Sequence, residues 1–468
     1  MSFYSINQTI CALATPMGRS AIGVIKISGT IAFDVLKRVF KPLSKKDYDP
    51  LSQHVSYGWI VDPQNDEYID DVVVVTYVNP KSYTGEDMVE ISCHGSPYIL
   101  SEVMKLLIAS GVRPAEGGEF TKRAFANGKM DLSQAEAVAD VISSTNKAAL
   151  RMSMSQMRGH FSRKIEALRE TLIRFCSLLE LELDFSEEDV EFADRKALTD
   201  SCSSILGELK ELSSSFEKGR VIKNGIPIAI AGATNAGKST LLNALLEDDR
   251  AIVSDIHGTT RDAIEDTVIL GGREFRFIDT AGIRDTDDPI ESIGINRSFE
   301  KINQASLTLW MIDASDKELD LHTLLQNITQ HASKSSICAL INKRDIVSAH
   351  EIEQITHVLK QAGISTIMAI SAKDHQDIAK VKEEILRHFE DLNVGENDII
   401  VSNLRHATAI QDAMVHLETV LNGLSLSIPG DLLAQDLRAA INHLGEVVGN
   451  VSSDDILHSI FKNFCIGK

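Results

Sequence analysis

The stretch Gly232-Ala-Thr-Asn-Ala-Gly237-Lys238-Ser239 is the most informative part of this chain. It follows the apolar, strand-like run Ile226 to Ala231 and precedes a helix-compatible segment from Thr240 to Glu247. A strand, a glycine-containing loop and a helix in this order form a phosphate-binding loop, because backbone N–H groups at the helix N-terminus can approach phosphates closely. The pattern predicts that Lys238 reaches the β and γ phosphates of a nucleotide and that the Ser239 hydroxyl binds magnesium.

Further apolar runs follow this loop and alternate with polar, helix-compatible stretches. Such an alternation of β and α segments indicates a mainly parallel sheet covered by helices. We therefore predict an α/β domain over residues 225–390, with the phosphate-binding loop after its first strand. The runs are Phe275 to Ile278, Leu307 to Ile312, Ile337 to Ile341 and Ile367 to Ile370.

Three short motifs, each placed after a predicted strand, select the base and the reaction. In Asn342-Lys343-Arg344-Asp345, the Asp345 carboxylate can accept hydrogen bonds from the N1–H and amino group of guanine, which adenine does not offer in that arrangement. Asp279-Thr280-Ala281-Gly282 brings a carboxylate to the magnesium shell and an N–H group to the γ-phosphate. Ser371-Ala372-Lys373 completes the base pocket. The order and spacing of these motifs predict a GTPase.

The loop Gly258-Thr259-Thr260-Arg261-Asp262 supplies a second hydroxyl for magnesium, and Thr260 is the better placed candidate. Ile283 stands where Ras-like GTPases carry the glutamine that orients the attacking water. Another group must therefore orient this water. The acidic stretch from Asp285 to Glu291 is close enough in sequence, and the alternative reading of the same stretch is a solvated loop.

The regions on both sides of the α/β domain have the apolar spacing of helices. From Met157 to Leu179 apolar residues recur every three or four positions, as on one face of a long helix, and similar stripes run from Ala407 to Leu424 and from Leu433 to Val448. The simplest arrangement is one helical domain, residues 125–224 and 391–468, into which the α/β domain is inserted. Residues 1–124 carry β-rich runs and a predicted helix near Ile99 to Ala109, so we expect a separate α+β domain there.

Composition limits the function further. The formal net charge is −20, from 47 Lys and Arg against 67 Asp and Glu, so a nucleic-acid partner would need a local basic patch or a helper protein. No apolar run approaches the roughly 18 residues of a membrane span, and the first residues do not form a signal peptide. We expect a cytoplasmic protein without membrane contact. The six cysteines lie far apart without a Cys-x-x-Cys pair, so we expect them to be reduced.

Together with the GTPase motifs, both ends of the chain resemble the MnmE (TrmE) family of tRNA-modification GTPases, of the TrmE-Era-EngA type within the TRAFAC class. The resemblance covers nearly the whole chain. Its most specific part is the terminal Phe464-Cys465-Ile466-Gly467-Lys468. The other stretches that carry it are Gly23 to Gly29, Tyr83 to Asp87, Gly118 to Phe125, Asp131 to Ala137 and Asp184 to Glu188. Lys26 stands where many members carry arginine.

This resemblance implies an enzyme that hydrolyses GTP and works with the FAD-containing protein MnmG. The pair would add an aminomethyl or carboxymethylaminomethyl group at C5 of the wobble uridine of certain tRNAs. The resemblance further implies that the N-terminal domain forms a homodimer and binds a reduced folate, of the 5-formyl- or methylene-tetrahydrofolate type, as the carbon donor. The matching folate positions are Lys26, Glu90, Lys129 and Lys468, and Cys465 is implied to be functional in the modification.

The resemblance also implies that potassium activates hydrolysis when the two GTPase domains of the homodimer meet. Asn235, Ser254, Ile256 and Thr259 would bind potassium, Ser239 and Thr260 magnesium, and Glu291 would orient the water. The predicted catalytic residues are thus Glu291, Lys238 and Cys465. The residues predicted to contact GTP are Asn235, Ala236, Gly237, Lys238, Ser239, Thr240, Ser254, Asp255, Ile256, His257, Gly258, Thr259, Thr260, Asp279, Thr280, Ala281, Gly282, Asn342, Lys343, Asp345, Ser371, Ala372 and Lys373.

Two other interpretations stay open from the residues alone. One is a GTP-switched ribosome-assembly factor of the Era or Der type, which the single phosphate-binding loop and the lack of a basic tail with a Gly-x-x-Gly loop disfavour. The other is a folate-dependent methyl-transfer enzyme with a regulatory GTPase domain. Whether activity needs a flavoprotein would distinguish this last interpretation from the tRNA-modifying one.

Overall fold

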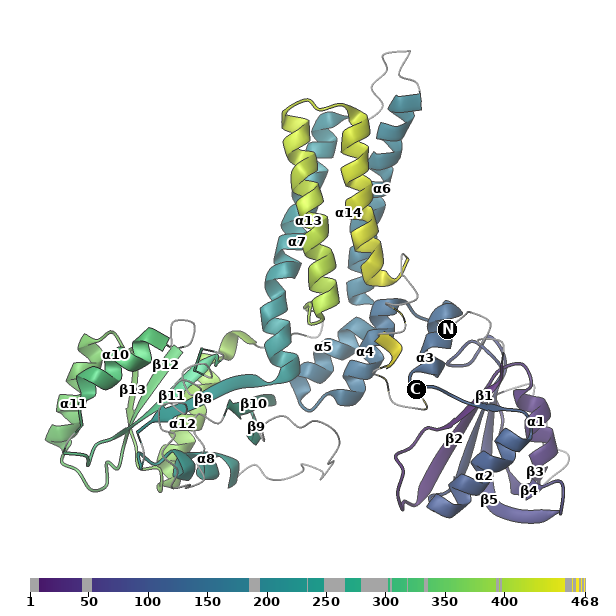
Figure 1. Cartoon of the computed structure of the whole chain (residues 1–468), viewed down its shortest axis with the longest axis horizontal. Helices are drawn as coiled ribbons and strands as arrows, with labels where there is room; N and C mark the ends of the chain where they lie inside the picture. The colour runs from purple at the N-terminus through teal and green to yellow at the C-terminus, as the bar shows by residue number, and fades with distance from the viewer. Residues whose placement is uncertain are drawn as a thin grey trace, which may run out of the picture. The chain divides into compact units, whose positions relative to one another are not determined.

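The computed structural model forms two compact units, which are described separately (Figure 1). Unit 1 comprises Met1–Ser143, Ser153–Lys210 and Thr408–Lys468, and unit 2 comprises Ser144–Met152 and Glu211–Ala407. The domain boundaries at residues 124, 224 and 390 follow from sequence patterns and stay predictions. The structure describes residues 8–43, 53–184, 194–233, 235–247, 266–278, 302–303, 305–317, 319–331, 336–392, 395, 398–450, 457, 460–462, 464 and 467.

Unit 1 begins with a seven-stranded sheet of order β3-β4-β5-β6-β2-β1-β7. Apolar residues alternate along its strands, and one set of side chains is buried beneath helices α1 (Ala32–Val39) and α2 (Pro97–Ala109), which Figure 1 shows against the sheet. This alternation is the signature of a sheet with one face in the core. The strands are β1 (Ile10–Leu13), β2 (Ile22–Ser28), β3 (Phe40–Pro42), β4 (Val55–Asp62), β5 (Glu67–Tyr77), β6 (Met88–His94) and β7 (Arg113–Pro114).

The second face of this sheet is covered only in part. Helix α3 (Glu119–Ala126) places Phe120 against Ile10 and Ala12 of β1. At the β4–β5 end the same face carries Tyr57 and Val73, which pair across the strands and are 49% and 38% exposed. Apolar side chains thus line a part of the sheet that no described helix of unit 1 covers.

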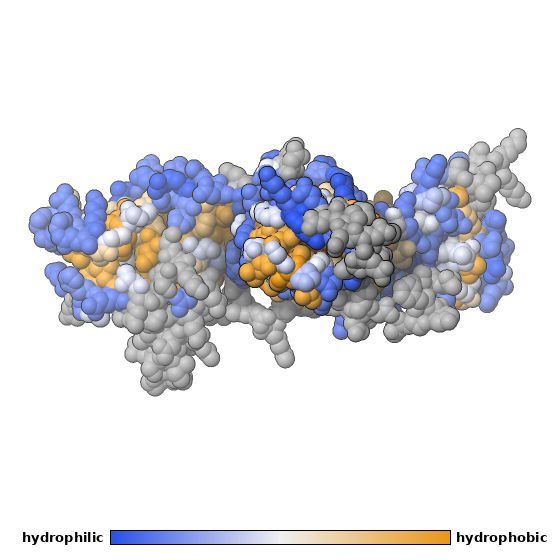
Figure 2. Space-filling model, turned by 90° about the horizontal axis from the view of Figure 1, so that it is seen from above, coloured by the Kyte–Doolittle hydropathy of each residue, from blue (hydrophilic) through white to orange (hydrophobic). Residues whose placement is uncertain are grey.

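The helical part of unit 1 combines segments from both sides of the α/β region. Helices α4 (Leu132–Ser143) and α6 (His160–Asp184) precede it, α14 (Gly430–Val448) follows it, and α14 packs along α6. Helix α7 (Arg195–Asn224) directly precedes the α/β region in the sequence, and α13 (Leu404–Ser425) follows it. Figure 2 shows apolar side chains gathered at the end of the helical part that faces the viewer. Leu426, which follows α13, and Leu432, at the start of α14, are exposed.

One predicted helix is wrong in its extent. The apolar stripe from Met157 to Leu179 predicted a single long helix, but α5 (Lys147–Met157) ends at Met157 and α6 begins at His160. Gly159 between them has φ +76°, a left-handed conformation that ends a helix and that residues with a side chain rarely adopt. Met157 packs against the cluster of α4 and the C-terminal segment, and Phe161 and Ile165 of α6 are buried, so the apolar spacing continues across the break.

The C-terminal segment of the chain returns to the N-terminal domain. Leu457, Phe461 and Phe464 are buried in a cluster with α4, and a Cβ atom at Gly118 would lie 2.7 Å from the Phe461 carbonyl oxygen. Further along, a Cβ atom at Gly467 would lie 2.5 Å from the carbonyl oxygen of Leu13 at the end of β1. The tail therefore packs along the start of α3 and reaches the end of β1.

Unit 2 contains a six-stranded sheet of order β13-β12-β11-β8-β10-β9, in which only the β9–β10 pair is antiparallel. The predicted apolar runs are confirmed as its parallel strands, and apolar clusters fill both faces. The strands are β8 (Ile226–Gly232), β9 (Asp266–Leu270), β10 (Arg273–Ile278), β11 (Leu307–Asp313), β12 (Ser336–Asn342) and β13 (Thr366–Ala369). The helices are α8 (Lys238–Glu247), α10 (Leu321–His331), α11 (Ala349–Gln361) and α12 (His375–His388), followed by the short η3 (Glu390–Leu392).

The fold class predicted from the sequence is confirmed. The chain combines an N-terminal α+β domain, a helical domain with segments from both sides, and an α/β domain of the phosphate-loop type. Within the described ranges, no helix has both the length and the hydropathy required to cross a membrane.

Candidate functional site

The phosphate-binding loop joins β8 to α8, as its sequence predicts. Strand β8 ends at Gly232 and the helix begins at Lys238, so the loop N–H groups lie at a helix N-terminus. The Lys238 ammonium donates hydrogen bonds to the carbonyl oxygens of Gly232 (2.7 Å) and Ala233 (2.8 Å). Asn235 has φ +65°, a left-handed conformation that asparagine adopts more readily than most residues. The loop thus has the curvature and the cation that a polyphosphate site requires.

Asn342 links the phosphate-binding loop to the predicted base-binding region through hydrogen bonds. Its side chain is buried, donates a hydrogen bond of 2.7 Å to the carbonyl oxygen of Ala236, and accepts one of 2.9 Å from the N–H of Ala372. Gly237 has φ +98°, and a Cβ atom there would lie 2.3 Å from Asn342 Nδ2, so only glycine fits. Residues of three predicted motifs therefore meet at one buried amide.

Asp345, the predicted guanine acceptor, is exposed and oriented by its neighbours. A hydrogen bond from the Ser371 hydroxyl, followed by one from a backbone N–H group, holds the pKa of Asp345 below its ordinary value. The Ser371 N–H in turn donates to Asp377 Oδ2 at 2.9 Å, and this carboxylate is 1% exposed and pairs with Arg344. Asp345 is consequently an ionised acceptor at neutral pH.

Two carboxylates that support this region were not identified from the sequence. Asp377 on α12 holds the Ser371 backbone, and Asp313 at the end of β11 accepts a hydrogen bond of 2.6 Å from the Lys343 ammonium. Lys343 has φ +65°, a left-handed backbone conformation. Asp313 follows a predicted apolar strand, and the carboxyl ends of parallel strands share one edge of a sheet. This position could have indicated that Asp313 lies near the other strand-end motifs.

Several predicted nucleotide, metal and catalytic positions lie outside the described residues. They are Ser254, Asp255, Ile256, His257, Gly258, Thr259, Thr260, Asp279, Thr280, Ala281, Gly282, Glu291, Cys465 and Lys468. The described nucleotide residues come together as expected along the carboxyl edge of the sheet. Their individual roles stay predictions.

A second polar cluster lies on the N-terminal sheet. Lys26 of β2 and Glu90 of β6 are register partners, and Lys26 Nζ lies 3.7 Å from Glu90 Oε1. The Tyr77 hydroxyl donates to Glu90 Oε2 at 3.2 Å, and burial, followed by the nearby Glu90 carboxylate, raises the pKa of Tyr77. Lys26 Nζ also lies 5.9 Å from the centre of the Tyr83 ring, within the range of a cation–π contact. The structure thus brings the predicted Lys26–Glu90 pair together with two aromatic rings.

Lys129 reaches the same region through the loop that contains Tyr83. Its ammonium donates a hydrogen bond of 2.9 Å to the Pro80 carbonyl oxygen. A Cβ atom at Gly85 would lie 3.3 Å from the aliphatic part of the Lys129 side chain. The tail residue Gly467 contacts Leu13, whose strand partner Ile25 precedes Lys26. Tyr83 lies in one of the stretches that carry the family resemblance, and Tyr77 was not identified from the sequence.

A buried ionic cluster holds the 79–87 loop, which contains Tyr83. Arg123 is 1% exposed and donates hydrogen bonds to both carboxylate oxygens of Glu86 (3.2 and 3.0 Å) and to Glu119 Oε1 at 3.0 Å. Glu86 also accepts a hydrogen bond of 2.7 Å from the Ser28 hydroxyl. Burial acts to raise the pKa of Glu119, but hydrogen bonds from Arg113, the Glu116 backbone and Arg123 outweigh it, and the pKa lies below its ordinary value. The 79–87 loop is therefore held by charge pairs in the domain interior.

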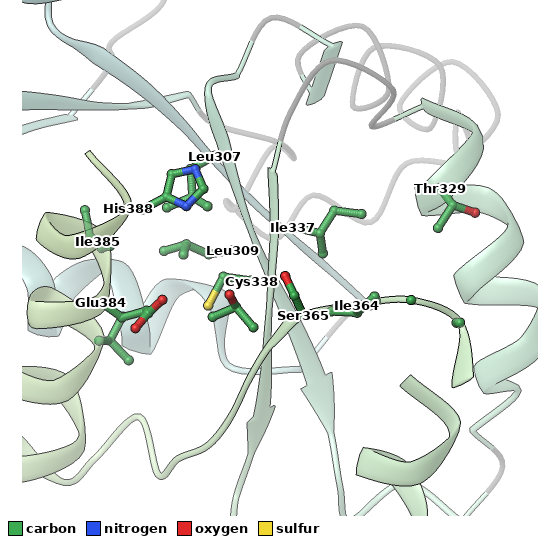
Figure 3. A pocket seen from close by; sticks show the side chains of 14 residues that line it. Leu307, Leu309, Thr329, Ile337, Cys338, Ile364, Ser365, Glu384, Ile385 and His388 are labelled. Atoms are coloured by element: carbon green, nitrogen blue, oxygen red, sulfur yellow. The ribbon is translucent and has the colours of Figure 1, made fainter. Parts of the chain in front are cut away.

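A third feature is a pocket of about 270 Å³ at the opposite edge of the unit 2 sheet, shown in Figure 3. Leu307, Ile337 and Thr366 line it near the amino ends of their strands, away from the nucleotide edge. Burial raises the pKa of the Cys338 thiol to about 12 and lowers that of His388. The pocket therefore offers no thiolate nucleophile at neutral pH.

Comparisons with known proteins match both the N-terminal domain and the rest of the chain. A family model described as the MnmE helical domain matches residues 132–465, and one described as the GTP-binding protein TrmE N-terminus matches residues 9–129. The tRNA modification GTPase MnmE of Bacteroides thetaiotaomicron is 48% identical over 468 residues, covering 99% of this chain and 100% of the relative. The protein of the same description from Christiangramia forsetii is 47% identical over 474 residues, covering 99% of this chain and 100% of that protein.

Among solved structures, a variant of Era from Aquifex aeolicus bound to GDP.AlF4- is 27% identical, covering 41% of this chain and 66% of that chain. Its TM-score is 0.28. The family matches span both ends of the chain, and the described phosphate-binding loop and base region account for its GTPase activity. The chain belongs to the MnmE (TrmE) family of tRNA modification GTPases.

Proposed function

We propose that this GTPase acts with the FAD protein MnmG to add an aminomethyl or carboxymethylaminomethyl group at C5 of the wobble uridine of certain tRNAs, with a reduced folate as carbon donor. The observation that carries the proposal is the Lys26–Glu90 cluster, which lies beside the docked C-terminal tail in a chain that also has a guanine nucleotide site. A switch protein without a carbon-transfer role has no need for this second polar site.

The chemistry of the Lys26–Glu90 cluster fits a pterin. The Glu90 carboxylate can accept hydrogen bonds from the amino and N3–H groups of a pterin ring, as carboxylates do for such paired donors. The Tyr83 ring and Lys26 offer stacking and a positive charge next to it. Lys129 and, by its position after Gly467, Lys468 are proposed to bind the formyl oxygen or the glutamate tail, and Cys465 is proposed to act in the modification.

The hydrolytic step is proposed to use the phosphate-binding loop with two cations. Lys238 would stabilise the β and γ phosphates, and Ser239 with Thr260 would hold magnesium, which neutralises developing charge on the phosphates. Asn235, Ser254, Ile256 and Thr259 would bind potassium, and Glu291 would orient the water. Asn235 has a left-handed conformation, which turns the loop at this residue.

The uncovered part of the N-terminal sheet is proposed as the homodimer surface. Tyr57 and Val73 lie there with Val55, which is 62% exposed, and exposed apolar side chains of this kind favour burial against a partner. Glu90 lies in the same cross-strand row as Val75 and Val55. A dimer that covers this face would therefore close one side of the proposed folate site.

The decisive experiment compares tRNA nucleosides from strains that carry the wild-type chain, no chain, or Glu90→Gln. We expect the C5-modified wobble uridine to be lost without the chain and strongly reduced in Glu90→Gln. The matched control is Glu67→Gln, which changes an exposed carboxylate of the neighbouring strand β5. Normal nucleosides in the strain without the chain would refute the proposed reaction.

Folate binding and hydrolysis are tested separately on the purified protein. Glu90→Gln and a chain lacking the last four residues should weaken binding of 5-formyl-tetrahydrofolate while GTP turnover stays near the wild-type rate. Asn235→Ala should abolish the preference for potassium over sodium at constant ionic strength. Glu291→Ala should keep GTP binding but lower turnover on the order of 10²-fold, because water positioning acts in the transition state. Turnover that is indifferent to the cation would refute the potassium assignment.

A further inference from the structure

The β9–β10 hairpin lies between the two segments to which the GTPase motifs assign nucleotide sensing. Strand β9 begins at Asp266, shortly after Thr260, and β10 ends at Ile278, directly before Asp279. Loops that contact the γ-phosphate change their arrangement between the GTP and GDP states of many GTPases. Both ends of this hairpin are therefore connected to segments that the motifs predict to respond to the nucleotide. Strand β9 also ends the six-stranded sheet order, with β10 as its hydrogen-bonded neighbour.

The closed end of the hairpin is packed between two helices. A Cβ atom at Gly271 would lie 2.8 Å from a methyl carbon of Leu386 on α12. On the other side, a Cβ atom at Gly272 would lie 3.5 Å from Cβ of Lys147 at the start of α5. Any shift of the hairpin therefore changes contacts that are already close.

A specific polar contact joins the hairpin to the residues just before α5. The Thr145 hydroxyl donates a hydrogen bond to Glu274 Oε2 on β10. Hydrogen bonds to a carboxylate are stronger than bonds between neutral groups. Thr145, Lys147 and the hairpin all belong to unit 2, although α5 lies in the sequence of the helical domain.

The start of α5 is itself firmly held. The Asn146 side chain accepts a hydrogen bond of 2.9 Å from the N–H of Ala149, which caps the helix, and donates one of 3.5 Å to the Ile222 carbonyl oxygen. Ala149, Met152 and Ile222 form a small buried cluster. These contacts fix the start of α5, which follows shortly after Thr145.

We propose that the contact between Thr145 and Glu274 couples the nucleotide state of the GTPase domain to helix α5. Thr145 acts through Glu274 and is a positioning residue. A contact of this kind shifts an equilibrium only if it differs between the two nucleotide states. By linkage, removing the contact must then change the ratio of the affinities for the two nucleotides. The factor is the same as the one by which it changes the equilibrium between the two arrangements of α5.

The test uses the full-length chain with Thr145→Val, which keeps the shape of the side chain but removes the donor. We expect the ratio of the dissociation constants for GDP and a non-hydrolysable GTP analogue to change at least about threefold, at the low end of typical coupling. We also expect hydrogen exchange of residues 147–152 to lose its difference between the two nucleotide states. Both measurements use nucleotide alone, so their outcome does not depend on the proposed tRNA chemistry.

Thr323→Val is the matched control, because Thr323 Oγ1 donates a hydrogen bond of 2.6 Å to Asp320 within the start of α10. It should leave the ratio and the exchange difference as in the wild type. Glu274→Gln keeps an acceptor oxygen but removes the charge, so it should shift the ratio of the two dissociation constants in the same direction by a smaller factor. If Thr145→Val fails to fold, the result for Glu274→Gln tests the proposal. Wild-type ratios and exchange in the Thr145 and Glu274 variants, or an equal shift in Thr323→Val, would overturn the proposal.

Discussion

The two polar sites of this chain are built in different ways. The predicted nucleotide site consists largely of backbone groups and side chains from short contiguous motifs at strand ends, and its predicted guanine acceptor Asp345 is exposed. The Lys26–Glu90 site consists of side chains from separate strands, supported by the buried charge cluster around Arg123. The residues of a site built from one loop are brought together by that loop alone. The residues of a site built from charge pairs between separate strands meet only when the whole domain is folded.

The largest expected effect is on the N-terminal domain. Arg123→Met should reduce the free energy of unfolding of this domain by about 3–5 kcal/mol, because Glu86 and Glu119 lose the buried partner between them. Chemical denaturation followed by the fluorescence of Trp59 in β4 measures it in a Trp310→Phe background, because Trp310 in β11 would otherwise report on unit 2. GTP affinity should stay at the wild-type value.

Arg113→Met is the matched control for this substitution. Arg113 pairs with Glu119 as well, but its side chain is 29% exposed, so the cost should be clearly smaller. If Arg123→Met and Arg113→Met destabilise the domain equally, the distinction between the buried and the exposed member of the cluster is lost.

The second effect is on base selection at the nucleotide site. Asp345→Asn should weaken GTP binding on the order of 10²-fold, because two hydrogen bonds to a carboxylate are lost, and it should admit xanthine nucleotides. Isothermal titration with GTP, XTP and ATP measures the change. Asp391→Asn, which alters an exposed carboxylate of η3 in the same unit, should bind as the wild type does. Equal affinity of the wild-type chain for ATP and GTP would contradict the assignment.

The third effect concerns the link within the nucleotide site. Asn342→Ala leaves the Ala236 carbonyl and the Ala372 N–H without their side-chain partner, so it should cost about 1–3 kcal/mol of stability in the α/β domain. GTP affinity should fall together with stability, because the amide joins the phosphate loop to the base pocket. Thermal unfolding with and without GTP separates the two. Loss of affinity at unchanged stability would indicate that Asn342 contacts the nucleotide and does not support the loops.

The smallest effect is a pH dependence of the N-terminal domain. The pKa of Glu119 is lowered in the folded chain, so its contribution to stability is present above its unfolded-state pKa and is lost as the pH falls through the folded-state value. Glu119→Gln should therefore flatten the acid side of the stability profile below about pH 5. Denaturant midpoints between pH 3 and pH 7 measure it. An unchanged acid limb in Glu119→Gln would show that this carboxylate does not contribute.

Sequence patterns alone determined the fold class, the five parallel strands of the α/β sheet and the phosphate-binding loop between β8 and α8. The reason is that phosphate loops and strand-end motifs are local, so residues that act together are neighbours in sequence or follow successive strands. Strand β9 was not identified from the sequence, and the individual nucleotide contacts stay predictions. The same reasoning overextended one helix, because an apolar stripe does not record the break at Gly159. Lys26, Glu90 and Lys129 were assigned through the family resemblance, since nothing in their local sequence marks them.

Only the tertiary structure decided the partners that support these residues. Register places Lys26 opposite Glu90, the sheet brings Tyr77 to the same carboxylate, and Arg123 reaches Glu86 across 37 positions of sequence. The docking of the tail on Gly118 and Leu13 joins the two ends of the chain, and the Thr145–Glu274 contact spans 129 positions. Such contacts depend on how separate elements pack, and hydrophobic periodicity determines which face of an element is buried but not which element covers it.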